Sequence, residues 1–455
     1  MKKILIINIE TKAREFNSRM MVAYQALTRG YKVVIGAQNE MNGFLKYLPK
    51  GIFFDKSIAR NKLQKLLKIK NLGHKIVSLD EEGIASQNNQ HFYLKQRMSK
   101  ETLNLAEYFF TWGNDEKELI ESRYAEYKNK IKTTGNPRIE LWRPEYAEFY
   151  KNEVTKINKK YKDFIFITSN FASIQHARGD DFLKNQDIAF NKVETKKDED
   201  IFNAKKAFMA KVYIAFLNMI KTLSKSSPDR TIIIRPHPAD NIETWKENFK
   251  QYNNVFIEYE YSATPWIIAC ECMIHSSCAT GIEGFLMNKP VFSYLPYKDH
   301  EFINYISNIL SDVCNTEQQL LDKTNEVFNK NYNLSGNRKL KIQENKHILD
   351  NIDSFESSKM ILDYIDKINI SHHRDIKKYR LSIFYVKNEF KHLIKKIIGR
   401  NTKADAYDQQ KMPGITLKEV QTTLDQFKAF DDQGKDKRFK INKIHNKNLF
   451  VISNQ

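Results

Sequence analysis

The sequence predicts an α/β protein with two doubly wound domains and a basic, mostly helical C-terminal extension. Short apolar segments alternate with amphipathic helical patterns, which is typical of βαβ units and a parallel sheet. A second series of this kind begins near residue 163 and ends near residue 370. At 455 residues the chain is also too long for one hydrophobic core. We therefore expect domains at 1–150 and 155–370, and an extension at 371–455.

The first domain begins with a buried strand and an amphipathic helix. After the apolar residues 3–9, Phe16, Met20 and Leu27 recur at helical spacing, and Gly30 ends the helix. The KVVI strand that follows completes a βαβ unit. Elements of this domain are expected as strands at 32–35, 51–54, 75–79, 108–111 and 130–133 and a helix at 115–124.

A polar stretch at 143–162 precedes the second domain, which repeats the alternation. Residues 172–200 are rich in Asp, Asn, Gln and Lys, so we expect a loop or a partly mobile insertion there. The expected strands are 163–168, 231–234, 255–259, 272–274 and 290–294, and the expected helices are 201–223, one from 242, one near Trp266, and 279–286.

The protein is strongly basic, with a formal charge of +19. Residues 371–455 hold 19 Lys and Arg against 9 Asp and Glu, so they carry +10 of this charge. A basic excess suits nucleic acid, an anionic membrane or an anionic substrate. Because no arginine-rich arm, zinc finger or aromatic RNA-binding motif accompanies it, we do not expect nucleic acid as a partner. The basic amphipathic pattern at 379–398 either contacts a membrane surface or, as we favour, packs on the core.

No metal, disulfide or membrane span is expected. Cys270 and Cys272 lack zinc-site spacing, and we expect Cys278 and Cys314 to be buried thiols like them. The Asp-Glu-Asp run at 198–200 resembles an Asp-x-Asp metal motif, but it lies in the lysine-rich segment expected to be a loop rather than at a strand end. There is no secretory signal and no apolar segment of the ~18 residues that span a bilayer, so we expect a cytoplasmic protein.

Two neighbouring apolar strands end in small polar clusters, in the segments TIIIRPHP and CMIHSSC. In α/β proteins the carboxyl ends of parallel strands bind ligands, so two such turns predict a nucleotide site. We expect His237 to donate to a phosphate, and Ser276 and Ser277 to bind phosphate where the next helix begins. Arg235 would pair with phosphate or a sugar carboxylate, and Glu283 would bind ribose hydroxyls.

Each of these residues also has a structural alternative. His237 could simply shape its turn, and Arg235 could point to the other face of its strand. The two serines could be helix caps, and Glu283 could favour the helix dipole.

A second candidate site is the acidic turn at Asp80, Glu81 and Glu82, which precedes Gly83 and follows a predicted strand. Its position at a strand's carboxyl end places these acids in the ligand crevice of the first domain. A carboxylate there could act as a nucleophile or as a base that deprotonates an acceptor. Polar residues that end other strands are weaker candidates for acceptor or sugar binding, namely Glu10, Lys12, Arg14, Asn136 and Arg138.

Several separated segments resemble the bacterial family of surface carbohydrate biosynthesis proteins. The resemblance covers about residues 1–300 and a C-terminal KMPGITLKEV segment near position 411. The order of an acidic-Gly, a His-Pro and a Ser-Ser motif is also similar to that of retaining β-Kdo transferases of capsule and lipopolysaccharide synthesis. This implies a GT-B fold, in which two Rossmann-like domains face a cleft. The segments are IETKAREF, SLDEEGIA, TGNPRIELWRPE, RPHPADN and HSSCATGIEGFLMNKPVFSY.

The resemblance also implies roles for individual residues. The Kdo transferases use CMP-activated ulosonic acids, and their His-Pro motif, here His237, contacts CMP. Their essential carboxylate directly precedes the glycine, which points to Glu82. The capsule enzymes have Asp at that position, so Glu81 and Asp80 remain open. A nucleophile would give retention of configuration and a base would give inversion.

We therefore expect a glycosyltransferase that moves a Kdo- or nonulosonic-acid-type residue from a CMP-sugar to an anionic or lipid-linked glycan, without a metal or other cofactor. A peripheral contact with the inner membrane would suit its charge. The alternatives are a UDP-sugar or CDP-alcohol donor on the same fold, a basic nucleic-acid-binding protein, or a non-catalytic scaffold.

Overall fold

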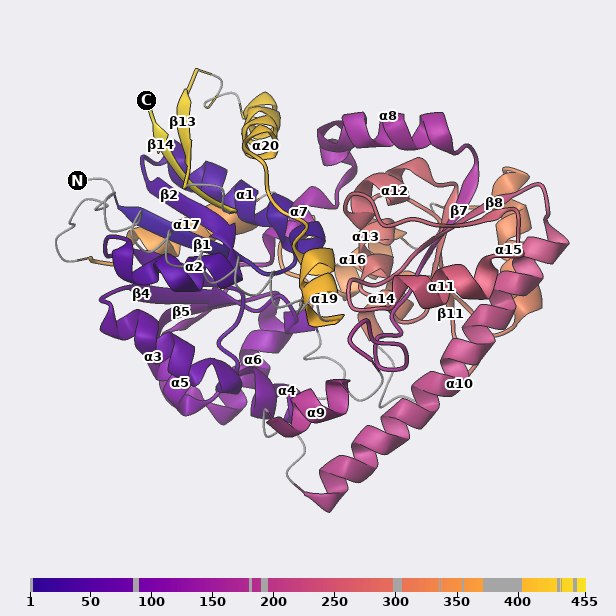
Figure 1. The fold of residues 1–455 in the computed structure, drawn as a ribbon, viewed down its shortest axis with the longest axis horizontal. Helices are drawn as coiled ribbons and strands as arrows, with labels where there is room; N and C mark the ends of the chain where they lie inside the picture. The colour runs from indigo at the N-terminus through magenta and orange to yellow at the C-terminus, as the bar shows by residue number, and fades with distance from the viewer. Residues whose placement is uncertain are drawn as a thin grey trace, which may run out of the picture. The chain divides into compact units, whose positions relative to one another are not determined.

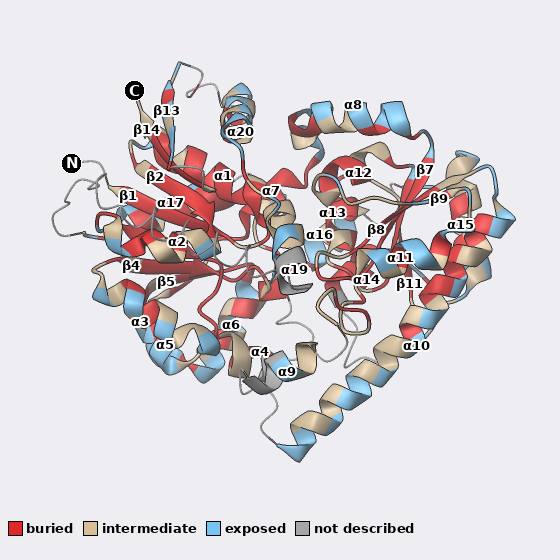
Figure 2. Ribbon diagram, viewed as in Figure 1, coloured by how far each residue is buried: buried red, intermediate tan, exposed pale blue. Residues whose placement is uncertain are grey.

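The computed structural model describes residues 3–84, 90–179, 182–189, 195–297, 305–334, 336, 338–353, 356–370, 403–431, 434, 436–444 and 448–455. These residues form two compact units (Figure 1). Unit 1 contains the described residues up to 84, residues 90–141, and those from 346 onward; unit 2 contains those of 142–345. Each unit has its own sheet and its own core, and the central strands of both sheets are buried (Figure 2).

Unit 1 is built on an eight-stranded sheet in the order β13-β14-β2-β1-β3-β4-β5-β6. The strands β1 to β6 are parallel, whereas β14 runs antiparallel to β2 and β13. Because β1 has β2 on one side and β3 on the other, the strand order reverses at β1, where an α/β sheet opens a ligand crevice. The strands are β1 (Ile4–Ile9), β2 (Lys32–Ala37), β3 (Ile52–Asp55), β4 (Lys75–Leu79), β5 (Ala106–Thr111), β6 (Ile131–Thr133), β13 (Phe439–Lys443) and β14 (Leu449–Asn454).

Helices of unit 1 bury apolar side chains against this sheet. Leu66 and Ile69 of α3, for example, pack with Phe53 and Ile76 of the strands. The α-helices are α1 (Lys12–Thr28), α2 (Gln38–Phe44), α3 (Leu63–Asn71), α4 (Gln90–Arg97), α5 (Lys100–Leu105), α6 (Asn114–Arg123), α7 (Pro137–Leu141), α17 (Ser357–Asp366), α19 (Lys403–Lys411) and α20 (Leu417–Ala429). Short 3-10 helices lie at Leu45–Tyr47, Arg60–Lys62 and Ala125–Tyr127.

Unit 2 is built on a fully parallel six-stranded sheet in the order β12-β11-β10-β7-β8-β9. Its order reverses at β7, which lies between β8 and β10. The strands are β7 (Phe164–Thr168), β8 (Thr231–Arg235), β9 (Val255–Ile257), β10 (Cys272–His275), β11 (Val291–Tyr294) and β12 (Asp312–Cys314). The helices are α8 (Lys151–Lys160), α9 (Phe182–Ala189), α10 (Lys196–Ser226), α11 (Ile242–Phe249), α12 (Ala263–Ala269), α13 (Thr280–Leu286), α14 (Tyr305–Leu310), α15 (Glu317–Phe328) and α16 (Arg338–Glu344), with a 3-10 helix at Pro144–Tyr150.

The predicted helical extension at 371–455 is wrong for its described part, which belongs to unit 1. Strand β14 pairs with β2, and this pairing needs Gly36, because a Cβ there would lie 2.1 Å from the Asn448 carbonyl oxygen. Tyr24 of α1 also packs against Phe427 and Phe439. The last part of the predicted 155–370 domain belongs to unit 1 as well, since α17 packs on α1. The helix expected at 379–398 lies outside the described residues.

The insertion predicted at 172–200 is only partly a loop. Residues 182–189 form α9, and the acidic run at 198–200 lies at the start of α10, with Asp198 and Glu199 in its first turn. Thr195 and Asp198 cap that helix reciprocally, so these acids serve helix initiation. Within the described ranges, no helix combines the length and the apolar character needed to cross a lipid bilayer.

Candidate functional sites at the switch points of the two sheets

The turns that follow β7, β8 and β10 carry a group of polar residues, which we call the unit 2 turn cluster (Ser169, His237, Asp240, Ser276 and Ser277). The Ser169 hydroxyl donates to Asp240 Oδ2 at 2.6 Å and accepts from the backbone N–H of His237 at 2.8 Å. Thr168 and Thr280 hydroxyls are 2.8 Å apart and tie the β7 end to the segment after β10. The cluster thus lies where the strand order reverses, the position predicted for a nucleotide.

His237 has a defined tautomer in this cluster. Its Nδ1 accepts a hydrogen bond from the backbone N–H of Ala239 at 3.1 Å. In the neutral ring the proton is therefore on Nε2, which acts as a donor. This geometry is compatible with the predicted role of His237 toward a phosphate oxygen.

Asp240, which the sequence analysis did not single out, organises the turn. Its carboxylate is fully buried and accepts hydrogen bonds from Ser169 and, at 3.1 Å, from Trp245 Nε1. Burial raises the pKa of Asp240 to about 6 in spite of these bonds. Through Ser169 it fixes the backbone of His237, and its place three residues after that histidine could have identified it.

Ser276 and Ser277 do not cap the following helix. Helix α13 begins at Thr280, and Ala279 precedes it without a side-chain cap. Ser277 has φ +52°, a left-handed conformation that is strained for a residue with a side chain, and its hydroxyl accepts from Asn308 Nδ2 at 3.1 Å. The two hydroxyls are thus presented by a tight turn and not by a helix terminus, which corrects the expected position.

The neighbouring His275 is a structural residue. It is fully buried, its Nδ1 accepts from the Cys278 backbone N–H at 3.2 Å, and its Nε2 lies 2.9 Å from the Ser311 hydroxyl. Burial lowers the pKa of His275 to about 3, so it is neutral. Gly281 is required beside it, because a Cβ there would lie 2.3 Å from His275 Nε2.

Arg235 and Glu283 contact other protein groups in place of the predicted ligands. Arg235 donates to the carbonyl oxygen of Glu260 at 2.7 Å and to that of Tyr261. Glu283 is buried and accepts from the Thr264 hydroxyl. These contacts hold Arg235 on the loop after β9 and Glu283 on α12, so we do not retain either residue in the nucleotide site.

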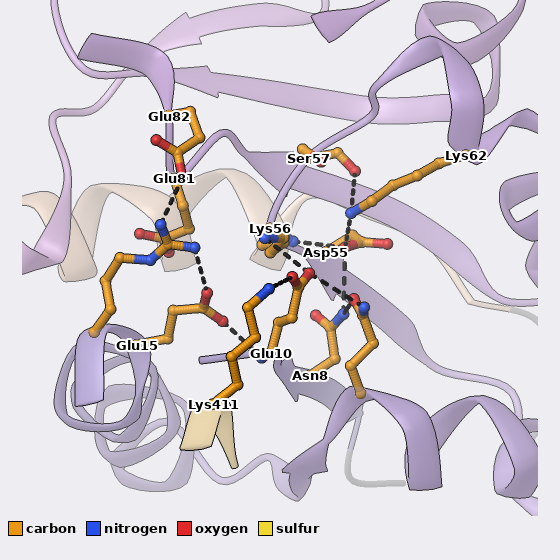
Figure 3. Close-up of polar contacts among 12 residues, drawn as sticks. Asn8, Glu10, Glu15, Asp55, Lys56, Ser57, Lys62, Glu81, Glu82 and Lys411 are labelled. Atoms are coloured by element: carbon orange, nitrogen blue, oxygen red, sulfur yellow. Dashed lines mark hydrogen bonds and ion pairs between the residues drawn. The ribbon is translucent and has the colours of Figure 1, made fainter. Parts of the chain in front are cut away.

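At the switch point of unit 1, charged side chains gather at the carboxyl ends of β1, β3 and β4 (Figure 3). We call this group the unit 1 polar cluster, and it contains eight cations and six acids. Its members are Glu10, Arg14, Glu15, Arg19, Asp55, Lys56, Lys62, Lys65, Asp80, Glu81, Glu82, Arg97, Arg138 and Lys411.

Within the acidic turn, Asp80 is a buried structural residue. It pairs with Arg97, whose Nε lies 2.7 Å from Asp80 Oδ2, and it accepts from the Glu82 backbone N–H at 2.9 Å. Trp112 Nε1 donates to the Asp80 carbonyl oxygen at 2.6 Å. Gly83 is required here because a Cβ would lie 2.4 Å from Trp112 Cδ1. The acidic-Gly motif therefore reflects the close approach of the indole ring.

The other two acids of the turn differ in accessibility. The Glu81 side chain is 2% exposed and lies 3.0 Å from Arg19 Nη2 and 3.5 Å from Arg138 Nη1. The Glu82 side chain is 43% exposed and lies 2.5 Å from Arg14 Nη1. Partial burial favours the neutral form of Glu82, but Arg14 and the cations around it outweigh this effect and lower its pKa to about 2. Of the three acids, Glu82 is the one whose ionised carboxylate is exposed to solvent.

The turn after β1 links Glu82 to two lysines. Arg14 also pairs with Glu15 at 3.0 Å, and Glu15 accepts from the Glu10 backbone N–H at 2.8 Å. Glu10 then pairs with Lys56 at 2.8 Å and with Lys411 at 3.2 Å. Although burial opposes ionisation, these lysines hold the pKa of Glu10 well below its ordinary value.

A further part of the cluster, at the end of β3, was missed in the sequence. Asp55 is fully buried between Lys62 and Lys65, at 3.0 and 2.8 Å, and these lysines hold its pKa far below the ordinary value in spite of burial. Burial lowers the pKa of Lys62 to about 8. Asp55 and Lys56 end an apolar strand just as the recognised motifs do, and that pattern could have revealed them.

The remaining predicted residues divide into two groups. Three of them lie in the unit 1 polar cluster: Arg138 pairs with Glu81, Glu10 pairs with Lys56, and Arg14 pairs with Glu82. Lys12 instead donates to the Gly414 carbonyl oxygen, and the buried Asn136 accepts from the Arg138 backbone N–H at 2.9 Å. Their contacts are structural. Among the described residues, no group of three His, Cys, Asp or Glu side chains is arranged to hold a metal ion.

No family model and no curated protein matches this chain. Among solved structures, UDP-GlcNAc 2-epimerase from Neisseria meningitidis bound to UDP-GlcNAc is 13% identical, covers 81% of this chain and 100% of its own, and gives a TM-score of 0.50. The fold is of the GT-B type. This likeness confirms the predicted fold class of two Rossmann-like units, and at such an identity it shows the fold alone.

Two further structures are similar at lower scores. S. aureus MnaA with UDP is 14% identical, covers 80% of this chain and 96% of its own, and has a TM-score of 0.48. The wall teichoic acid polymerase TagF with CDPG is 12% identical, covers 80% of this chain and 88% of its own, and also has a TM-score of 0.48.

Proposed function

We propose that this GT-B protein is a glycosyltransferase of bacterial surface polysaccharide synthesis. The proposed donor is a CMP-activated ulosonic or nonulosonic acid, and the acceptor is an anionic or lipid-linked glycan. The observation that carries the proposal is Glu82, an accessible and ionised carboxylate at the carboxyl end of β4, in the turn that resembles the acidic-Gly motif of Kdo transferases.

The low pKa of Glu82 favours a nucleophile over a base. A carboxylate with a pKa near 2 is a weak proton acceptor at neutral pH, whereas it is fully ionised and leaves readily from a glycosyl ester. In the proposed reaction a Glu82 oxygen bonds to the anomeric carbon as the bond to the CMP phosphate oxygen breaks. The acceptor hydroxyl then displaces Glu82, its proton passes to water, and the configuration is retained.

Unit 2 would bind the nucleotide through its turn cluster. His237 Nε2 is a donor, and the hydroxyls of Ser276 and Ser277 lie in the turn after β10 at the switch point. A single phosphate on CMP needs less charge compensation than a diphosphate, so the proposal requires no metal ion. The choice of cytidine rests on the resemblance, and the epimerase of the same fold binds UDP-GlcNAc.

Donor turnover tests the proposal directly. The wild-type protein is incubated with CMP-Kdo, a CMP-nonulosonic acid, CDP-glycerol and UDP-GlcNAc, and release of each nucleotide is measured. We expect release from a CMP-sugar only. Turnover restricted to CDP-glycerol or UDP-GlcNAc would contradict the donor assignment.

Two matched substitutions test the role of Glu82. Glu82→Gln should lower kcat by roughly 10³-fold or more, because the nucleophile is lost. Glu118→Gln on the exposed surface of α6 is the control and should keep wild-type turnover. Full activity of the Glu82 variant would sink the assignment.

We also propose that the protein works at the inner face of the cytoplasmic membrane, where its basic excess would meet anionic lipid. Sedimentation with vesicles that contain phosphatidylglycerol, but not with purely zwitterionic vesicles, is the expected result. Salt-sensitive binding to duplex DNA that survives His237→Ala would favour the nucleic-acid alternative instead.

A further inference from the structure

The C-terminal segment 411–420 forms a fixed turn against the start of α1. Gly414 at its centre has φ +109°, which favours glycine, and Thr416 caps α20 reciprocally with Glu419. Lys12 Nζ contacts both sides of this turn, because it lies 2.5 Å from the Gly414 carbonyl oxygen and 2.6 Å from Glu419 Oε1.

A second anchor holds the same turn to the sheet. The backbone N–H of Ile415 donates to Asn448 Oδ1 at 2.6 Å, and Ile415 itself is buried. Asn448 in turn donates through its backbone N–H and its amide to Glu40, at 2.6 and 3.0 Å. These contacts fix the chain directly after Lys411, the last residue of α19, and so restrict where Lys411 lies.

The consequence is that Lys411 lies within the unit 1 polar cluster (Figure 3). Its ammonium group and that of Lys56 approach different oxygens of Glu10, at 3.2 and 2.8 Å. One carboxylate thus faces two ammonium groups, in a cluster that holds eight cations against six acids. The Lys411 and Glu10 side chains are 25% and 26% exposed, so the pair is open to solvent.

This lysine pair is connected to the proposed nucleophile by direct contacts. Glu82 pairs with Arg14, Arg14 pairs with Glu15, and Glu15 holds the backbone of Glu10. Glu82 and the two lysines therefore belong to one connected network of contacts.

We propose that Lys411 and Lys56, held by Glu10, form an oxyanion subsite for a carboxylate or phosphate group of the substrate. The C-terminal segment then supplies a binding residue to the site of unit 1. The identity of the substrate rests on the proposed function, whereas binding of a simple oxyanion does not. Lys411 donates to the anion without leaving Glu10, because an ammonium group has three donors.

Titration calorimetry of the full chain tests this subsite without catalysis. The probes are inorganic phosphate, N-acetylneuraminate as a carboxylate sugar, and N-acetylglucosamine as a neutral sugar. Lys411→Gln keeps a donor for Glu10 but removes the charge, Lys411→Arg keeps the charge, and Lys418→Gln on the exposed start of α20 is the matched control.

We expect Lys411→Gln to weaken phosphate or neuraminate binding at least ~5-fold, with Lys411→Arg closer to wild type and Lys418→Gln unchanged. Weakening confined to phosphate identifies a phosphate group as the ligand, and weakening confined to neuraminate identifies a carboxylate. Equal anion affinity in wild type and Lys411→Gln overturns the proposal, as does the absence of anion binding to wild type. A melting temperature for each variant shows whether the fold is kept.

The same variants separate this inference from the proposed function. If no nucleotide sugar is turned over but anion binding depends on Lys411, the subsite stands and the proposed function fails. If transfer occurs and Lys411→Gln leaves both the acceptor and donor KM and anion binding unchanged, the function stands and the subsite fails.

Discussion

The guanidinium of Arg14 lies 2.5 Å from the carboxylate of Glu82, and this ion pair sets the charge state of the exposed acid in the β4 turn. Burial alone would raise the pKa of Glu82, and Arg14 is the strongest of the cations that lower it. The reactivity of the turn should therefore depend on a residue of another element, helix α1.

Replacing Arg14 with Gln should raise the pKa of Glu82 by ~1–2 units, because the nearest cation is lost while the burial remains. In the profile of kcat/KM against pH, the acidic limb should shift to higher pH by the same amount. Activity should therefore fall at acidic pH and remain unchanged near pH 7. NMR titration of labelled glutamate side chains gives the pKa directly. Arg29→Gln, which breaks a remote ion pair with Asp363, should leave that pKa unchanged.

Asp240 predicts a pH dependence of stability. Its folded-state pKa is raised to about 6 from an ordinary value of 3.8, so the native state binds its proton more tightly than the unfolded state does. The protonated carboxyl of Asp240 stabilises the folded state by up to ~3 kcal/mol below pH ~4. This contribution to the free energy of unfolding is lost as the pH rises to about 6.

Urea unfolding of Asp240→Asn and wild type at pH 4.5 and pH 7 measures this effect as a difference. The variant should lose less stability than wild type over that interval. Asp229→Asn, on the exposed surface before β8, should follow wild type, and an identical pH response of the Asp240 variant would contradict the prediction.

Gly83→Ala should destabilise unit 1 by ~1–3 kcal/mol and displace the acidic turn, because its Cβ would lie 2.4 Å from Trp112 Cδ1. Tryptophan fluorescence during chemical unfolding reports both effects. Gly336→Ala, where the nearest atom is 4.0 Å away, is the matched substitution and should change stability little.

Phe450→Ala should cost ~3–5 kcal/mol, because Phe450 is fully buried in β14 beside β2. Phe430→Ala removes the same ring from a position that is 39% exposed and should cost far less. Calorimetric melting of both variants checks this, and equal melting temperatures would contradict the prediction.

Local patterns were enough to predict most of both sheets. The strand Lys75–Leu79 was expected with the bounds that the structure has, because an apolar run between polar turns specifies a buried strand. The position of the acidic and His-Pro turns at strand ends followed from the same alternation. Side-chain partners could not be predicted in this way, since Arg235 reaches carbonyl oxygens 25 and 26 residues away.

Contacts distant in sequence account for the errors. Nothing in β14 itself indicates that its partner is β2, and Gly36 is informative only once Asn448 is placed beside it. Likewise, the sequence does not reveal which acids of the β4 turn are buried, and the three differ in their partners: Asp80 pairs with Arg97, Glu81 with Arg19 and Glu82 with Arg14.

The contact between Lys12 and Glu419 joins residues that are 407 positions apart. On a ribosome that adds roughly 5–20 residues per second, the second partner appears about 20–80 s after the first. During that interval β2 has no β14, and all of unit 2 is synthesised. The start of α1 therefore reaches its final contacts only after residues 414–419 have been made, and β2 gains its β14 partner later still.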